Sequence, residues 1–160
     1  FVTTLVPPPS RVLDAGCGPG RISAVLHQRG HQVVGVDVDP VLIAAAVEDH
    51  PGPSFRLGDL STFDLTTEPE CEPLDAAVIA GTGGGPVTPD PARGGLPRPA
   101  VHARPGGRVV VGCRLDWHYS AEALTADAEA AGMTLQHRFA TWDLEPFTDD
   151  ADFAVSIFAR

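Results

Sequence analysis

The chain has 160 residues, 43% of them hydrophobic, a length and composition that predict one domain with a buried core and leave no room for a second. Eleven basic and twenty-one acidic residues give a formal net charge of −10, and every basic residue is an arginine. Nucleic-acid binding depends on clustered lysine and arginine, so this balance disfavours DNA and RNA as partners. Arginines 93, 98, 104 and 108 form one small group, for which a solvated loop is the better interpretation.

Cysteine and histidine spacing predicts neither a disulfide framework nor a metal site. The cysteines Cys17, Cys71 and Cys113 are odd in number and show no C-x-x-C pair. His27 and His31 are four residues apart, but Gly30 between them is expected to end the helix, which disfavours a metal-binding pair. No apolar stretch reaches the roughly 20 residues of a membrane helix, and no cleavable signal precedes the first expected strand. We therefore expect a cytoplasmic protein without a metal; nothing predicts its oligomeric state.

The first motif is VLDAGCGPGR, from Val12 to Arg21. An apolar run that reads as a buried strand ends in an acid, three alternate glycines follow, and a helix is expected over 21–29. A dinucleotide-binding loop needs its third glycine where Arg21 stands, so pyrophosphate binding is disfavoured. The carboxylate of Asp14 would repel a diphosphate and attract a cationic amino group. The pattern thus predicts an adenosine-like ligand that carries positive charge.

Two further apolar runs end in acids. The run HQVVGVDVDP, 31–40, places Asp37 at the end of a second strand, where a carboxylate can accept hydrogen bonds from both ribose hydroxyls. Asp39 and Pro40 are expected to start the next helix, as N-cap and first helical residue. The run FRLGDL, 55–60, ends a third strand in Gly58 and Asp59. The alternatives are that Asp37 is a helix-starting surface acid and Asp59 an ordinary turn residue.

With its D-x-G-x-G-x-G motif, this chain resembles the class I S-adenosylmethionine-dependent methyltransferases. The resemblance implies that S-adenosylmethionine is the cofactor, that the glycine loop holds its methionyl end, and that Asp59 takes the adenine amino group. It also places the residues after a fourth strand, 74–81, beside the methionyl part. The cofactor-binding residues expected on this basis are Asp14, Gly16, Cys17, Gly18, Gly20, Asp37, Val38, Asp59, Leu60, Ala80 and Gly81.

The remaining elements complete the fold that the resemblance implies. A fifth strand is expected over 106–113 after a turn at 104–107, then a helix over 120–131 closed by Gly132. Two final strands are expected over 133–140 and 152–159. The predicted fold is α/β, a doubly wound three-layer sandwich with a mostly parallel seven-stranded sheet and an antiparallel last strand. Family members usually carry helices before the first strand; here few residues precede it, so the covering helices are expected to be missing from this domain over 1–160.

The resemblance implies methyl transfer to a small-molecule acceptor by in-line displacement. Positioning and exclusion of water carry most of this chemistry, and a general base is needed only if the acceptor loses a proton. Acceptor-side residues should follow strands four to six. His118 is the candidate base, or else an exposed residue at a helix start. Arg114, Asp116 and Asp143 also fall in these segments, Asp143 more as a turn residue. The candidates for the acceptor pocket are Thr82, Trp117, Tyr119 and Trp142, and the aromatic ones could instead cover the core.

The segment 81–99 departs from the family pattern. Five prolines and six glycines discourage a helix there, and the segment reads as a lid or as a degenerate loop. The asparagine-proline-proline-aromatic motif of many nitrogen-methylating relatives is missing, so oxygen or carbon is the preferred atom. Two alternative functions stay open. One is a scaffold or partner subunit that binds S-adenosylmethionine or S-adenosylhomocysteine without catalysis; the weaker one is an NAD-dependent oxidoreductase.

Overall fold

The computed structural model describes residues 7–60, 62, 73–80, 103–115 and 120–160. Among the described residues, strands and helices alternate from β1 to β3, and four strands with one helix follow. The elements are β1 (Arg11–Ala15), α1 (Arg21–Gln28), β2 (Gln32–Asp37), α2 (Pro40–Asp49), β3 (Ser54–Leu57), β4 (Leu74–Ala80), β5 (Ala103–Arg114), α3 (Ala121–Ala130), β6 (Thr134–Phe139) and β7 (Phe153–Ala159).

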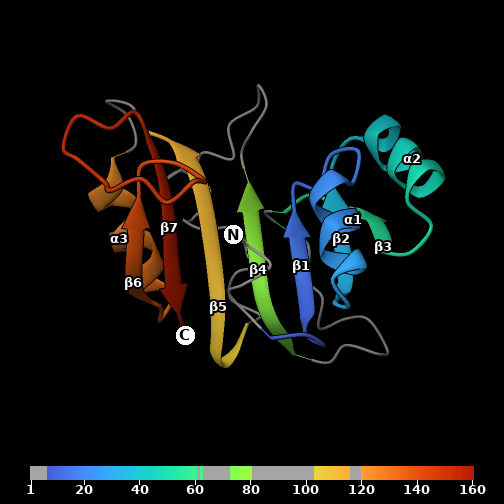
Figure 1. Ribbon diagram of the computed structural model, residues 1–160, viewed down its shortest axis with the longest axis horizontal. Helices are drawn as coiled ribbons and strands as arrows, with labels where there is room; N and C mark the ends of the chain where they lie inside the picture. The colour runs from blue at the N-terminus through green and yellow to red at the C-terminus, as the bar shows by residue number, and fades with distance from the viewer. Residues whose placement is uncertain (1–6, 61, 63–72, 81–102, 116–119) are drawn as a thin grey trace.

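In the described part of the chain, the strands form one sheet in the order β3-β2-β1-β4-β5-β7-β6 (Figure 1). The pairs from β3 to β5 are all parallel, whereas β7 runs antiparallel to both of its neighbours. The chain moves outward from β1 to β3 and then returns to β4 on the other side of β1. Ligands of open α/β sheets bind at the carboxyl ends of strands at such a reversal. The predicted fold class is confirmed.

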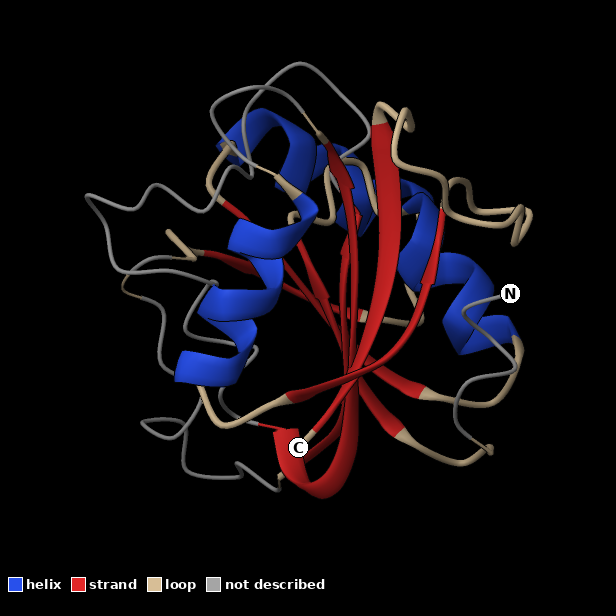
Figure 2. Ribbon diagram, turned by 90° about the vertical axis from the view of Figure 1, so that its left-hand side faces the viewer, coloured by secondary structure: helices blue, strands red, loops and turns tan. Residues whose placement is uncertain are grey.

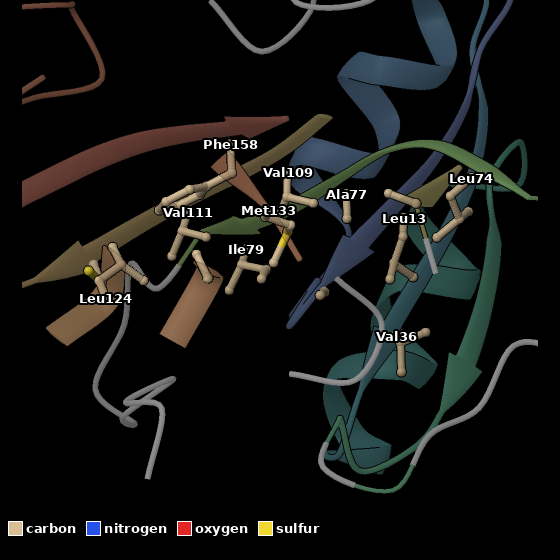
Figure 3. Close-up of a cluster of buried hydrophobic side chains, with 14 residues drawn as sticks. Leu13, Val36, Leu74, Ala77, Ile79, Val109, Val111, Leu124, Met133 and Phe158 are labelled. Atoms are coloured by element: carbon tan, nitrogen blue, oxygen red, sulfur yellow. The ribbon is translucent and has the colours of Figure 1, made fainter. Parts of the chain in front are cut away.

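Helices cover both faces of the sheet, as Figure 2 shows with the sheet seen nearly edge-on. On one face, Leu26 of α1 packs with Val12, Val33 and Val78. On the other, Leu124 and Ala128 of α3 join the larger cluster around Leu13, Ile79, Val111 and Phe158 (Figure 3). Neighbouring β1 residues therefore point to opposite helical layers, and both layers are apolar. This alternation explains why the inner strands read as continuous hydrophobic runs.

Two helices end in the same way, at glycines in the left-handed region. Gly30 has φ 89° and Gly132 has φ 78°. At α1, Gly30 N–H donates to His27 and His31 N–H to Leu26; at α3, Gly132 N–H donates to Glu129 and Met133 N–H to Ala128. This is the Schellman pattern, and it confirms the predicted cap at Gly132. Among the described residues, no helix combines the length and the apolar character needed to cross a membrane.

Some predicted boundaries need correction. The third strand was expected to end in Gly58 and Asp59, but β3 ends at Leu57, and Gly58 N–H donates to the carbonyl of Asp37 beyond the ladder. The fifth strand was expected to begin at Gly106 after a turn. Instead β5 begins at Ala103, which pairs with Leu74, while Arg108 pairs with Ala76. Four residues of β5 thus bulge against a single residue of β4, and Gly106 with φ 79° allows this bend.

Candidate cofactor site

The glycine loop is anchored to β2 by its own backbone. Gly16, Gly18 and Gly20 have φ of 78°, 53° and 83°, a region that favours glycine. The N–H groups of Gly16 and Cys17 both donate to the carbonyl of Val36, at 2.8 and 3.1 Å. The loop therefore turns at the carboxyl end of β1 and stays beside the end of β2, as the motif predicts.

Asp37 links this loop to the start of α2. Its Oδ2 accepts from Gly18 N–H at 2.8 Å and its Oδ1 from Asp39 N–H at 3.0 Å. Asp39 in turn caps α2, because its Oδ1 accepts from the N–H groups of Val41 and Leu42, and Pro40 is the first helical residue. The predicted helix start is confirmed. A carboxylate has lone pairs for about four hydrogen bonds, so the half-buried Asp37 keeps capacity for ligand hydroxyls.

Beneath the loop, the ring of Phe55 packs so closely against Gly20 and Gly35 that neither position has room for a side chain. A Cβ added at Gly20 would lie 2.8 Å from Cζ of Phe55, and one at Gly35 would lie 2.7 Å from Cδ1 of the same ring. By contrast, a Cβ at Gly18 would meet nothing within 4 Å. Gly20 and Gly35 thus serve packing, whereas Gly18 presents its backbone to open space. The sequence motif does not distinguish these two roles.

Cys17 belongs to this packed layer. It is 8% exposed and clusters with Ala46 and Phe55. Burial, together with the nearby carboxylates of Asp14 and Asp37, raises the pKa of its thiol to about 12. The thiol is therefore protonated at neutral pH, which is the wrong state for a nucleophile. Cys17 and Cys113 are both free thiols, while Cys71 lies outside the described residues.

Asp14 lies under the loop. It is only 1% exposed, and its Oδ2 accepts from the hydroxyl of Ser23 at 2.6 Å. Burial raises the pKa of Asp14 to about 6, and the Asp37 carboxylate adds to that rise, while the bonds from Ser23 oppose it. Sequence reasoning did not identify Ser23. Its position three residues into a helix, facing an acid at the preceding strand end, is the signal that could have identified it.

Apolar side chains stand beside Asp37 at the strand ends. Val38 is 67% exposed and Leu57, which pairs with Asp37 across β2 and β3, is 57% exposed. Asp59 is exposed just beyond β3, and Leu60 is half-buried against the main core cluster. Exposed apolar groups beside a carboxylate suit a nucleoside, which has a flat base and a polar sugar. Leu57 is a second residue that sequence reasoning missed.

Trp142, one of the residues predicted for the acceptor pocket, lies in the connection from β6 to β7. Its ring lies over Gly112 of β5, where an added Cβ would be only 2.2 Å from Cζ2, and against the cluster that contains Ala80. Because Ala80 and Gly112 pair at the carboxyl ends of β4 and β5, Trp142 reaches the expected edge of the sheet. Its Nε1 is buried and has no hydrogen-bond partner among the residues that the structure describes.

Of the other residues named from the sequence as acceptor-side candidates, Asp143 and Arg114 lie within the described part of the chain. Asp143 is exposed in a turn, where its N–H bonds the hydroxyl of Thr141, as the turn interpretation expected. Arg114 ends β5. No group of three or more metal-ligating side chains occurs within the described ranges. Gly81, Thr82, Asp116, Trp117, His118 and Tyr119, and the segment 81–99, lie outside the described residues.

Comparison with known proteins identifies the family. A family model described as a methyltransferase domain matches residues 12–107, which is more than half of the chain and includes the glycine loop. The chain belongs to the class I S-adenosylmethionine-dependent methyltransferases. A solved structure of a TehB-like methyltransferase from Corynebacterium glutamicum is 30% identical and covers 99% of this chain and 84% of its own, with a TM-score of 0.81. The predicted family and its cofactor, S-adenosylmethionine, are therefore confirmed.

Other relatives of this chain differ in what their names say they modify. A ribosomal protein L11 methyltransferase from Symbiobacterium thermophilum is 37% identical over 112 residues, 69% of this chain and 34% of that protein. A magnesium-protoporphyrin O-methyltransferase from Rhodobacter capsulatus is 43% identical over 56 residues, 32% of this chain and 25% of that protein. The chain thus spans about a third or less of these curated relatives. A magnesium protoporphyrin IX methyltransferase structure from Synechocystis, solved with bound S-adenosylmethionine, shares the fold at 17% identity, covering 96% of this chain and 71% of its own, with a TM-score of 0.72.

Proposed function

We propose that this chain transfers the methyl group of S-adenosylmethionine to a small-molecule acceptor, at oxygen or carbon rather than nitrogen. The observation that carries the proposal is the glycine loop, which Asp37 holds through Gly18 N–H at 2.8 Å and which leaves open space before Gly18. A ligand can approach the backbone there, and the adjacent carboxylate can accept its hydroxyls. The loop therefore fits the nucleoside and methionyl parts of the cofactor.

Each region of the site is assigned one part of that cofactor. The loop backbone at Gly16, Gly18 and Gly20 approaches the methionyl end, and Asp37 accepts the ribose hydroxyls. Exposed Val38 and Leu57 lie beside the adenine, whose amino group would donate to Asp59. Asp14 supplies negative charge from beneath the loop toward the ammonium group. The described chain at this edge offers these carboxylates, and the whole sequence contains no lysine, a balance that suits a cationic ligand.

The bound cofactor would supply a methyl carbon already activated by its sulfonium, so that the carbon–sulfur bond breaks as the bond to the acceptor forms. The protein must then align the acceptor and exclude water. Trp142, seated on Gly112 beside Ala80, is proposed as one apolar wall of the acceptor pocket, with Thr82, Trp117 and Tyr119. His118 is proposed to take the proton of a hydroxyl or carbon acid. A carboxylate acceptor would need no base.

Two observations narrow the choice of acceptor. The chain lacks the asparagine-proline-proline-aromatic motif of many nitrogen-methylating relatives. The net charge of −10 weighs against the ribosomal RNA substrates that some relatives' names indicate. The O-methyltransferase from Rhodobacter capsulatus supports an oxygen acceptor, whereas the ribosomal protein methyltransferase does not. Binding without catalysis is the competing proposal, and only turnover separates the two.

The first test is calorimetric titration with S-adenosylhomocysteine, with NAD as the control ligand. We expect the wild-type chain to bind the first and not the second. Asp37→Ala should lose about a hundredfold in affinity, because two hydrogen bonds to a charged acceptor disappear. Asp49→Ala is the matched control, since it removes an equally charged but exposed carboxylate from the last residue of α2. Equal affinity of Asp37→Ala and wild type would remove the ribose assignment.

Turnover is tested next with labelled methyl donor and a panel of hydroxylated, carboxylated and amine acceptors. Label transfer to a hydroxyl, carboxyl or carbon acceptor supports the proposal, and transfer to an amine corrects the atom. Tight cofactor binding without transfer to any acceptor would favour the scaffold interpretation. His118→Ala should lower the rate with a hydroxyl acceptor and leave S-adenosylhomocysteine affinity unchanged.

A further inference from the structure

Helix α1 begins without the side-chain cap that the other helices have. Asp39 caps α2, and Ser120 caps α3 by accepting from Ala123 N–H. The N-cap of α1 is Gly20, which makes no side-chain cap bond, and the first turn of α1 contains no acid. The first N–H groups of a helix have no partner within it, so a partner from outside is needed.

Asp14 contacts this end of α1 from the end of β1. The hydroxyl of Ser23, the third residue of α1, donates to Asp14 Oδ2 at 2.6 Å, and the backbone of Ser23 also favours the ionised form of the same carboxyl group. Both residues are buried, with 1% and 0% exposure. A carboxylate at a helix N-terminus also interacts favourably with the helix dipole. The two ends of the glycine loop are therefore joined by one buried contact.

The surroundings of Asp14 make its negative charge costly before a ligand binds. Its sheet neighbours at the same level are Gly35 and Val78, which are not titratable. The titratable groups that face it are the Asp37 carboxylate, which raises its pKa, and the protonated Cys17 thiol. No basic side chain of the described residues is among the groups that set this pKa. The bonds from Ser23 are the contacts that favour the ionised form.

We propose that Ser23 is a positioning residue for cofactor binding, whose hydroxyl keeps the Asp14 carboxylate ionised under the glycine loop and so sets the pH range in which the cofactor ammonium is bound. This inference rests on the proposed function, because it needs a cationic ligand above the loop. It assigns Asp14 two roles, the cap of α1 and the buried countercharge. Ser23 itself does not contact the cofactor.

The test is calorimetric titration with S-adenosylhomocysteine at pH values on either side of about 6. Wild-type affinity should fall as the pH drops through this range, because a protonated Asp14 must lose its proton before it can attract the ammonium. In Ser23→Ala the midpoint should move up by about one pH unit, since a donor to the charged form is gone. Ser23→Thr should restore the wild-type midpoint, and Asp14→Asn should flatten the profile.

Ser120→Ala is the matched control, because it removes a serine from the start of α3, far from the glycine loop. It should lower stability and leave the pH profile unchanged. An equal loss of affinity at every pH in Ser23→Ala would show a merely structural role and overturn the proposal. An unchanged profile in Ser23→Ala would also overturn it. Absence of binding by the wild type at every pH would instead defeat the proposed function, and this inference with it.

Discussion

The two halves of the sheet place chemistry at the same edge by different means. In the half formed by β1, β2 and β3, backbone groups and short-range bonds make the site, as Gly18 N–H to Asp37 and Gly16 N–H to Val36 illustrate. In the half formed by β5, β6 and β7, the described feature is one large ring, Trp142, resting on Gly112 from a connection between strands. Backbone recognition suits a fixed cofactor, whereas side chains carried on connections suit a variable acceptor.

The contrast also appears in the glycines. In the first half, Gly20 and Gly35 admit Phe55, a buried ring of β3 that is part of the core. In the second half, Gly112 admits Trp142, a partly exposed ring carried on a connection between two strands. The glycines of the first half thus make room for a ring of the core, whereas Gly112 makes room for a ring that part of the solvent can reach.

The largest expected effect comes from substituting Gly20, and Gly18 of the same loop serves as the comparison. Gly20→Ala should lower the free energy of unfolding by about 3 kcal/mol, because φ is unfavourable and the new Cβ meets Phe55 at 2.8 Å. Gly18→Ala should cost only about 1 kcal/mol, since its Cβ enters open space. That Cβ should instead lower S-adenosylhomocysteine affinity by about tenfold or more. Urea denaturation and calorimetry measure the two effects, and a Gly18→Ala variant with full affinity would contradict the assignment.

The next prediction concerns Asp14 in the ligand-free chain. Burial raises its pKa from 3.8 to about 6, so the folded state holds this proton more tightly than the unfolded state. The stability from this group is fully present below pH 3.8 and is lost as the pH rises through about 6. At neutral pH, Asp14→Asn should therefore raise the free energy of unfolding by as much as about 3 kcal/mol, while it weakens cofactor binding. A less stable Asp14→Asn variant above pH 7 would show that the cap matters more than the charge.

A third prediction tests whether a change in the half formed by β5, β6 and β7 leaves cofactor binding in the other half unaffected. Gly112→Ala should displace the Trp142 ring, because its Cβ would lie 2.2 Å from Cζ2, and should lower the free energy of unfolding by about 2 kcal/mol. S-adenosylhomocysteine affinity should stay at the wild-type value, while acceptor turnover or its specificity changes. The double variant Gly112→Ala with Trp142→Ala should regain part of the stability. Loss of cofactor affinity in Gly112→Ala would show that the two halves are coupled.

The same contrast decides what the sequence could predict. A stretch of only 26 residues contains the carboxyl end of β1, the glycine loop and the acid of β2. Hydrophobic periodicity and glycine spacing therefore suffice to place Asp14, Gly18 and Asp37 at the ends of the first two strands. The end of β3 was placed one or two residues too late, in Gly58 and Asp59, because the local pattern does not show that the ladder with β2 stops at Leu57. The position of Ser23 in the first turn of the helix after Asp14 made this contact possible to suspect, but the glycine spacing alone does not show that the turn brings the two side chains together. Trp142 and Gly112 are 30 residues apart in the sequence, so no local pattern indicates that they are in contact.

The smallest expected effects come from substitutions of the helix caps. One cap lies in each half of the sheet, and neither is a residue proposed to contact the cofactor. Asp39→Ala and Ser120→Ala should each lower the free energy of unfolding by about 1 kcal/mol, because each removes a side chain that accepts from helix N–H groups. Their effects on the site should differ. Asp39 N–H holds Asp37 Oδ1 at 3.0 Å, so a frayed start of α2 should loosen the ribose carboxylate and weaken S-adenosylhomocysteine binding a few-fold. Ser120 caps α3, which packs on the face of the sheet opposite to α1. The Ser120→Ala variant should therefore keep the wild-type affinity. Equal affinities in the two variants would mean that Asp37 is held by Gly18 alone, and that the start of α2 serves stability rather than the site.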